Sequence, residues 1–190
     1  MPTAEQVYAM LGNENLWNTA ITCRRVLEEA GIPFSVCGGV AVCLHGYQRN
    51  TADLDLIIHP DKADLVRPLL DQAGFAWNPD QKEFRTDADI AVQFLMAGDR
   101  AGKGSEVCLP EPAGELNVEE IDGLPVLRLS KLIEIKIACG TGEVRRMHKD
   151  FADVVELIAI RGLDKSFARY LHQTVRKTFH ELVRNARGEP

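Results

Sequence analysis

The sequence predicts a mixed α/β fold, in which a mixed central sheet is flanked by helices and further helices follow at the C-terminal end. Two short apolar runs of strand length, at 34–37 and 56–58, predict buried strands. A glycine pair at 38–39 follows the first run and opens a short apolar segment of helical character. Between 145 and 161, apolar residues recur at helical spacing, which indicates an amphipathic helix.

Length and composition restrict the function classes. The chain has 190 residues, 45% hydrophobic and 26% charged, which suits one globular domain or a domain with a helical appendage. Its formal net charge of -6 argues against a dedicated nucleic-acid binder, because such proteins are more often basic. The longest apolar runs are far shorter than the ~20 residues that span a bilayer, so we expect no membrane segment.

The cysteines and the first residues bear on the compartment. Five cysteines are scattered without a Cys-x-x-Cys pair, which disfavours a zinc site or a disulfide framework. The first residues lack a basic start and an apolar stretch, so no secretory signal is predicted. We therefore expect a cytoplasmic protein.

The N-terminal third of the chain alternates between predicted helices and strands. Helices are predicted at 5–11 and 17–30, where apolar residues follow a helical stripe. The first central strand covers 32–37, and the short helix 39–45 ends before a glycine that tolerates left-handed backbone. The second central strand covers 52–59 and is closed by a proline.

The middle of the chain contains further strands and a long loop. A helix at 61–73 is followed by a short strand at 82–85. Alternating residues at 89–96 predict a third central strand, whose odd and even positions lie on opposite faces. The stretch 98–114, rich in glycine, proline and charge, predicts a loop, and an Asp-Gly pair within 116–127 indicates a hairpin.

The C-terminal third is predicted to be helical. We expect Ser130 to cap a helix at 131–139 that ends at Gly140. The helix 145–161 follows, and Asp164 starts a last helix. The exposed side of that last helix is basic, which favours RNA contact only weakly, because most such helices are simply solvated. The predicted domain division is 1–128 for the core with its N-terminal helices and 129–190 for the helical segment packed on it.

Two aspartates at the start of the second central strand are the strongest chemical signal. Asp53 and Asp55 are two residues apart on a strand, so both carboxylates project from one face. Their mutual repulsion is relieved by a hard divalent cation with oxygen ligands, such as Mg²⁺ or Mn²⁺. Gly38 and Gly39 let the backbone approach a ligand, and the helix behind them directs free N–H groups at an anion such as phosphate.

The Gly-Gly pair followed by Arg49-x-Thr51-x-Asp53-x-Asp55 resembles the nucleotidyltransferase superfamily that includes DNA polymerase beta. It is most similar to small prokaryotic members related to the abortive-infection nucleotidyltransferase toxins, over roughly residues 34–163. This resemblance implies the nucleotidyltransferase fold and places Arg49 and Thr51 at a nucleotide site. From the residues alone, Arg49 could pair with a carboxylate or a phosphate, or be solvated.

Gln93 departs from the family pattern. The resemblance implies a third carboxylate on a strand beside the pair, where this sequence has Val92-Gln93-Phe94-Leu95. The candidate catalytic residues are therefore Asp53, Asp55 and Gln93, with Asp53 and Asp55 as the metal ligands. A glutamine offers one neutral carbonyl oxygen and is no base, so reduced activity or lost catalysis is expected, unless a bulge shifts the register.

Three further nucleotide-site candidates lie on the predicted C-terminal helices. The resemblance implies that Lys136 meets the phosphates, whereas a lysine in this position could instead extend to solvent. Lys149 and Asp150 resemble the Arg/Lys-Asp-x-x-Asp segment of the family. The alternative for that segment is a solvated face with a Lys149–Asp153 pair.

Three functions remain open at this point. The first is a magnesium-dependent enzyme that transfers a nucleoside monophosphate from a nucleoside triphosphate to a hydroxyl of a small molecule, a protein or an RNA end. The second is a catalytically inactive member of the same fold that binds a nucleotide or a protein partner, such as half of a toxin–antitoxin pair. The third is an α/β domain whose Asp-Leu-Asp merely borders a strand, which leaves the glycine pair, Arg49 and Thr51 unexplained.

Overall fold

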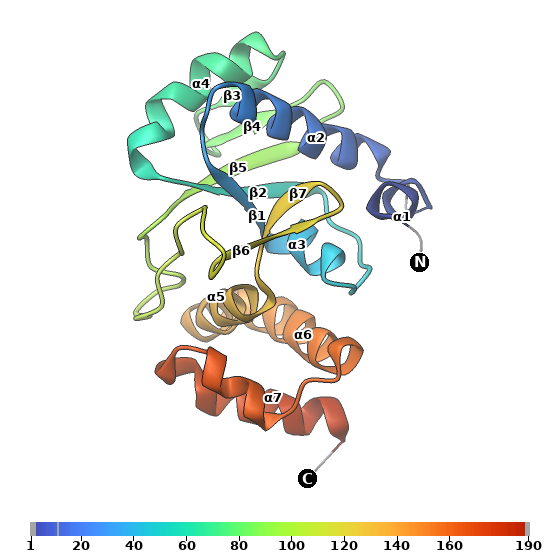
Figure 1. Ribbon diagram of the computed structural model, residues 1–190, viewed down its shortest axis with the longest axis vertical. Coiled ribbons are helices and arrows are strands. Elements are labelled where there is room, and N and C mark those ends of the chain that lie inside the picture. Colours follow the sequence, from blue (N-terminus) through green and yellow to red (C-terminus); the bar gives the residue numbers. More distant parts are fainter. Residues whose placement is uncertain (1–2, 11, 189–190) are drawn as a thin grey trace.

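The computed structural model describes residues 3–10 and 12–188 (Figure 1). In this part of the chain the α-helices are α1 (Ala4–Met10), α2 (Glu14–Glu29), α3 (Gly38–Leu44), α4 (Ala63–Gln72), α5 (Leu129–Gly142), α6 (Val144–Arg161) and α7 (Arg176–Arg187). The strands are β1 (Phe34–Cys37), β2 (Asp53–Ile58), β3 (Ala76–Asn78), β4 (Glu83–Arg85), β5 (Ala91–Met96), β6 (Val118–Ile121) and β7 (Leu124–Leu127). Short 3-10 helices are η1 (Pro60–Lys62), η2 (Lys165–Tyr170) and η3 (Gln173–Val175).

The strands form one mixed sheet in the order β3-β4-β5-β2-β1-β7-β6. β1 and β2 are antiparallel, with Cys37 opposite Asp55. β2 and β5 are parallel, with Asp55 opposite Gln93. β1 also pairs in parallel with β7, and the pairs toward the two edges are antiparallel. The mixed central sheet flanked by helices is therefore confirmed.

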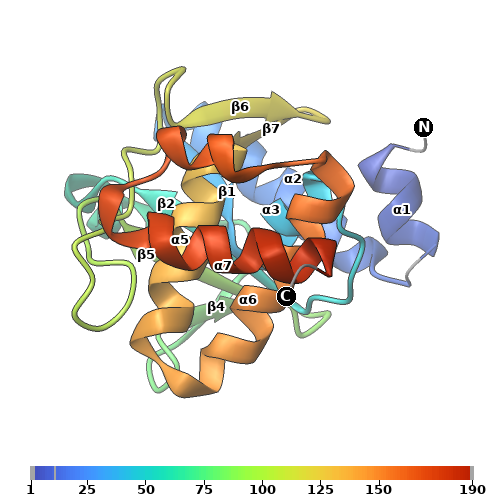
Figure 2. The same cartoon turned by 90° about the horizontal axis from the view of Figure 1, so that it is seen from below.

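Separate apolar clusters cover the two faces of the sheet. Leu54, Leu56 and Phe84 belong to the cluster that includes residues of α2 and α4. Ile57 belongs to the cluster formed with α5, α6 and α7, which lie on the other side of the sheet in Figure 1. Seen from below, α7 crosses in front of α5 and α6, and α6 contacts both (Figure 2). Because side chains alternate along a strand, the odd-numbered residues of β2 face α5 and α6.

The predicted boundaries of the helix after the hairpin are wrong at both ends. α5 begins at Leu129 with Arg128 in the N-cap position, so Ser130 lies inside the helix and caps nothing. Gly140 does not end it, because α5 continues to Gly142. A Cβ atom at Gly140 would lie 2.6 Å from Cε1 of Phe151, so the glycine allows α5 and α6 to approach closely.

The predicted last helix is interrupted. Asp164 caps the short helix η2, since its Oδ1 accepts a hydrogen bond of 2.7 Å from the backbone N–H of Ser166. The backbone is extended at Leu171, and α7 starts only at Arg176. Among the described helices, none combines the length and the apolar character needed to cross a bilayer. The domain division after residue 128 stays a prediction.

Candidate active site

The glycine pair lies directly beside the predicted carboxylates. Gly38 follows Cys37, the partner of Asp55 in the sheet, and has φ of +61°. A Cβ atom at Gly38 would lie 1.8 Å from Oδ2 of Asp55, and one at Gly39 would lie 2.3 Å from Oγ1 of Thr51. Both glycines are therefore explained by the close approach of β2 and the segment before it. Whether they also hold a triphosphate stays a prediction.

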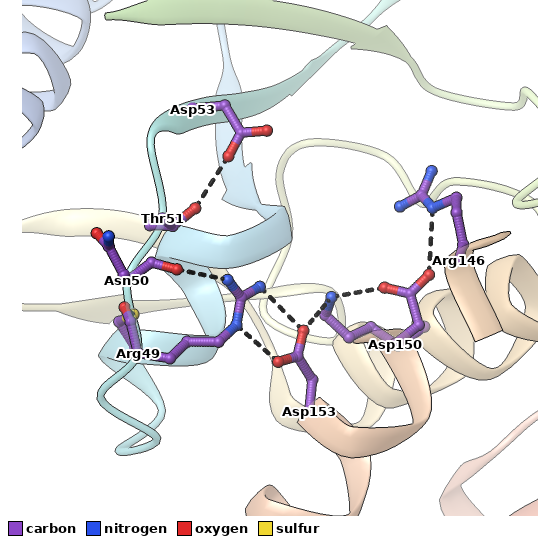
Figure 3. Close-up of polar contacts among 9 residues, drawn as sticks. Arg49, Asn50, Thr51, Asp53, Arg146, Asp150 and Asp153 are labelled. Atoms are coloured by element: carbon purple, nitrogen blue, oxygen red, sulfur yellow. Dashed lines mark hydrogen bonds and ion pairs between the residues drawn. The ribbon is translucent and has the colours of Figure 1, made fainter. Parts of the chain in front are cut away.

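Thr51 orients one of the two carboxylates. Its side chain is buried, and Oγ1 donates a hydrogen bond of 2.9 Å to Oδ1 of Asp53 (Figure 3). This bond satisfies one carboxylate oxygen and restricts the rotation of the side chain. Thr51 thus lies behind Asp53 and contacts the site through it.

Asp55 is held in an unfavourable environment for a charged group. Burial, and next the negative charge of Asp53, raise its pKa to about 6, against the lowering influence of Lys136 and Arg146. A raised carboxylate pKa means that the protein alone stabilises the ionised form less than water does. A cation bound between the two carboxylates would relieve that deficit.

Gln93 occupies the position expected for the third carboxylate. The parallel pairing places it directly opposite Asp55, without a bulge. Its Nε2 donates a hydrogen bond of 3.0 Å to Oε2 of Glu83 on the neighbouring strand. Asp89 cannot replace the missing carboxylate, because it is exposed, lies before β5 and forms an ion pair of 2.8 Å with Arg85.

A buried ion-pair network ties the segment before β2 to α5 and α6 (Figure 3). Arg49 binds Asp153 through both Nε, at 2.6 Å, and Nη2, at 3.0 Å. Lys136 Nζ lies 2.7 Å from Asp153 and 2.9 Å from Asp150, and Arg146 Nε lies 3.2 Å from Asp150. Lys136 is only 5% exposed, so it neither extends to solvent nor lacks partners.

The buried stripe of α6 includes the two aspartates of this network. Asp150 and Asp153 are 2% and 1% exposed, in phase with the buried Val154 and Leu157. A solvated face with a Lys149–Asp153 pair is therefore wrong as an alternative, since Asp153 is buried against other cations. Buried charges of this kind are tolerated when each has a partner.

The two carboxylates and the helical cations share one cavity of about 280 Å³. Five basic side chains line it, namely Arg49, Lys136, Arg145, Arg146 and Lys149. Three acidic side chains line it, namely Asp53, Asp55 and Asp150. The cavity is therefore locally positive although the chain carries a formal net charge of -6. Such a cavity attracts small polyanions.

Two of these cations have no competing carboxylate. Within residues 3–10 and 12–188, Arg145 and Lys149 form no ion pair, whereas Arg49, Lys136 and Arg146 do. Both side chains are on exposed positions of the first turns of α6. They are accordingly the cations best able to bind a phosphate without breaking an existing contact.

Known structures resemble this one in three dimensions, although the overall sequence identity is low. No protein-family model and no curated protein matches the chain. The crystal structure of ANT(2'')-Ia in complex with adenylyl-2''-tobramycin matches with a TM-score of 0.55 at 14% identity, covering 86% of this chain and 96% of that one. The solution structure of the same antibiotic-resistance factor gives 0.52 at 11% identity, covering 92% and 94%.

A third similar structure is that of an antigenic nucleotidyltransferase-like protein from Paracoccidioides brasiliensis, with a TM-score of 0.51 at 14% identity, covering 98% of this chain and 94% of that one. The chain has the nucleotidyltransferase fold. At these identities the likeness establishes the fold, and the roles of individual residues in it have to be argued from their geometry.

In this nucleotidyltransferase fold, nearly all predicted site residues come together. Thr51 is the exception, since it does not line the cavity. The predicted residues that do line it are Gly38, Gly39, Arg49, Asp53, Asp55, Gln93, Lys136, Lys149 and Asp150. Sequence reasoning missed Asp153, although its phase with the apolar residues of α6 was a signal that it is buried. It also missed Glu83, whose partners on β5 and β4 could not be inferred from a three-residue strand.

The donor atoms of the cavity fit a hard divalent cation. In the described part of the chain, no group of three or more His, Cys, Asp or Glu side chains is placed to hold a metal ion. The oxygens available are those of Asp53 and Asp55, with the amide oxygen of Gln93 as a neutral third. Mg²⁺ is commonly held by one or two carboxylates together with substrate phosphates, so this set suits it.

Proposed function

We propose that the protein is a nucleotidyltransferase that transfers a nucleoside monophosphate from a nucleoside triphosphate to a hydroxyl group, with Mg²⁺ or Mn²⁺ as cofactor. One observation carries the proposal. Asp53 and Asp55, from one face of β2, open into the same cavity as Arg145 and Lys149 of α6, which are free of ion pairs within the described residues. Carboxylates for a cation and cations for phosphates are the two requirements of this chemistry.

The basic wall of the cavity binds and orients the triphosphate. Arg145 and Lys149 contact its phosphate oxygens, and Arg146 assists from its exposed position next to Asp150. Lys136 was expected to contact phosphates directly. Because Lys136 is already bound to Asp150 and Asp153, its main contribution is to fix the position of α6 and to keep the cavity positive.

The transfer itself requires little covalent chemistry from the protein. The acceptor oxygen bonds to the α-phosphorus as the bond to the departing pyrophosphate breaks. A divalent ion bound at Asp53 and Asp55 would stabilise negative charge on the phosphate oxygens. Gln93 cannot receive the proton of the attacking hydroxyl, so that proton passes to a carboxylate of the pair or to water.

The acceptor is the finer part of the proposal. The neighbouring ANT(2'')-Ia was crystallised with an adenylylated tobramycin, which makes a small polyhydroxylated acceptor the first to test. A protein hydroxyl and an RNA end stay predictions, as does RNA contact through the basic C-terminal helix. The similarity to abortive-infection toxins and a role in a toxin–antitoxin pair also stay predictions, and growth arrest on expression, relieved by Asp53→Asn, is their test.

Ligand binding tests the site before any acceptor is known. We expect each accepted nucleoside triphosphate to raise the thermal unfolding midpoint in the presence of Mg²⁺, because a ligand that binds only the native state stabilises it. Asp53→Asn should abolish the rise. Asp71→Asn, which removes an exposed carboxylate of α4 on the other face of the sheet, is the matched control and should leave it unchanged. A rise that persists in Asp53→Asn would contradict the metal site.

Transfer is tested with triphosphates labelled on the α-phosphate. Tobramycin, total tRNA and the protein itself serve as acceptors, and incorporated label is measured with and without Mg²⁺. Label on any acceptor that disappears in Asp53→Asn supports the enzyme. Nucleotide binding without transfer to any of these acceptors would instead favour a catalytically inactive nucleotide-binding protein, in which Gln93 has replaced a catalytic carboxylate.

A further inference from the structure

Glu83 is a buried carboxylate that the proposed reaction does not use directly. It lies on β4, is only 4% exposed, and does not line the cavity. Its Oε1 accepts a hydrogen bond of 2.7 Å from Nε of Arg85, and its Oε2 accepts one of 3.0 Å from Nε2 of Gln93. Burying a carboxylate costs several kcal/mol unless its partners compensate, so both partners are needed.

Glu83 stands in a row with the candidate site. Asp55 on β2 is opposite Gln93 on β5. Phe84 on β4 is opposite Val92 on β5, so the residues adjoining that pair, Glu83 and Gln93, are neighbours across these two strands. Phe84 packs in the cluster on the other face, which leaves Glu83 on the same face as Asp55. The row therefore leads from β4, the strand next to the edge strand β3, to the cavity.

The charge of Glu83 decides which way the Gln93 amide is turned. An ionised carboxylate can only accept hydrogen bonds, so the group facing it has to be the NH₂ group of Gln93 and not its carbonyl oxygen. The carbonyl oxygen then occupies the other branch of the planar amide. In the described part of the chain this Oε1 accepts no hydrogen bond, and Gln93 lines the cavity together with Asp53 and Asp55.

We propose that Glu83 is a positioning residue that turns the amide oxygen of Gln93 toward Asp53 and Asp55, so that a divalent cation there gains a third oxygen ligand in place of a third carboxylate. This inference rests on the proposed function. Arg85, which also binds Asp89, forms an ion pair with Glu83 and holds its carboxylate in place. The site thereby keeps three oxygens at the cost of one negative charge.

Direct metal binding tests this role without relying on turnover. Mn²⁺ is titrated into the protein and free Mn²⁺ is followed by electron paramagnetic resonance. Glu83→Gln replaces the obligate acceptor with a group that can donate or accept, so the Gln93 amide can turn either way. We expect the dissociation constant of Mn²⁺ to rise about 10-fold or more, as for other residues that orient metal ligands.

Two further variants separate positioning from folding. Glu134→Gln alters another buried glutamate, which lies on α5 and is 5% exposed. Glu134 binds Lys131 and accepts a hydrogen bond from the backbone N–H of His172, so the variant should leave Mn²⁺ binding unchanged. Gln93→Asp, added to Glu83→Gln, supplies a ligand that presents oxygen in either orientation and should restore the affinity. Restored Mn²⁺ binding in the double variant also excludes the explanation that Glu83→Gln only lowers stability.

The Mn²⁺ titrations distinguish a failure of the proposed metal site from a failure of the proposed role of Glu83. If wild type binds Mn²⁺ through Asp53 but Glu83→Gln binds it within twofold of wild type, the role of Glu83 is refuted and the proposed function stands. If wild type binds no Mn²⁺, the proposed metal site fails and this inference fails with it. Weakened binding in Glu83→Gln that Gln93→Asp does not restore would indicate general damage to the sheet and would also refute it.

Discussion

Replacing Gly38 by alanine should destabilise the protein far more than its backbone conformation alone predicts. Gly38 and Gly162 both have φ of +61°, which costs an alanine about 1–2 kcal/mol. At Gly162 an added Cβ has nothing within 4 Å, whereas at Gly38 it would meet Asp55 at Oδ2, Cγ and Cβ, at 1.8, 2.7 and 2.9 Å. Rotating the Asp55 side chain cannot move its Cβ, so the backbone must shift.

The matched pair of variants gives the magnitude. We expect Gly162→Ala to lower the free energy of unfolding by about 1–2 kcal/mol. Gly38→Ala should lower it by about 2–5 kcal/mol, since overpacking adds about 1–3 kcal/mol. Urea unfolding in EDTA, followed by circular dichroism, measures both. Asp55→Ala removes the two closest contacts and should partly rescue Gly38→Ala. Losses within about 0.5 kcal/mol of each other for the two glycine variants would refute the steric argument.

Three further outcomes follow from buried groups. Asp153→Asn removes the carboxylate shared by Arg49 and Lys136 and should lower the free energy of unfolding in urea by about 3–5 kcal/mol. The control Glu28→Gln, which alters the exposed pair with Arg24, should lower it by less than about 0.5 kcal/mol. Equal losses in the two variants would contradict the buried network. Because folding raises the pKa of Asp55 from 3.8 to about 6, the native state favours its protonated form, and this contribution to stability is lost as the pH rises through 6. Without metal, Asp55→Asn should therefore be more stable than wild type at pH 8, and the difference in the free energy of unfolding should shrink as the pH falls below 6. A difference that does not change with pH would contradict the raised pKa of Asp55. Gly140→Ala should lower stability by about 1–3 kcal/mol because of Phe151, despite the helix propensity of alanine, and a stabilised variant would show that α5 and α6 can move apart.

Local patterns in the sequence predicted the central strands and the shared face of the two aspartates, but not the strand order. Alternation along β2 predicted the shared face of Asp53 and Asp55, and the family resemblance singled out Gln93 on a neighbouring strand, whereas the register that places Gln93 opposite Asp55 came from the structure. The predicted features depend on neighbours in the chain or on strand periodicity, which a sequence displays directly.

Long-range contacts account for what the sequence did not reveal. Gly140 matches the sequence pattern of a helix end, but it lies within α5 and leaves room for the ring of Phe151. Asp153 is buried because Arg49, 104 positions earlier, supplies its countercharge. Glu83 depends on partners on two strands. In each case the role depends on a residue of another secondary-structure element, which the local sequence does not identify.

The origin of the opposing charges in the cavity has a consequence for biosynthesis. Asp53 and Asp55 are made early, and the cations of α5 and α6 are made late. A nascent chain with a finished sheet but with its last helices still inside the ribosome carries two repelling carboxylates and no counterpart for a triphosphate. The triphosphate site that we propose is therefore complete only once α5 and α6 have been synthesised, and a product that ends before α5 lacks its helical cations.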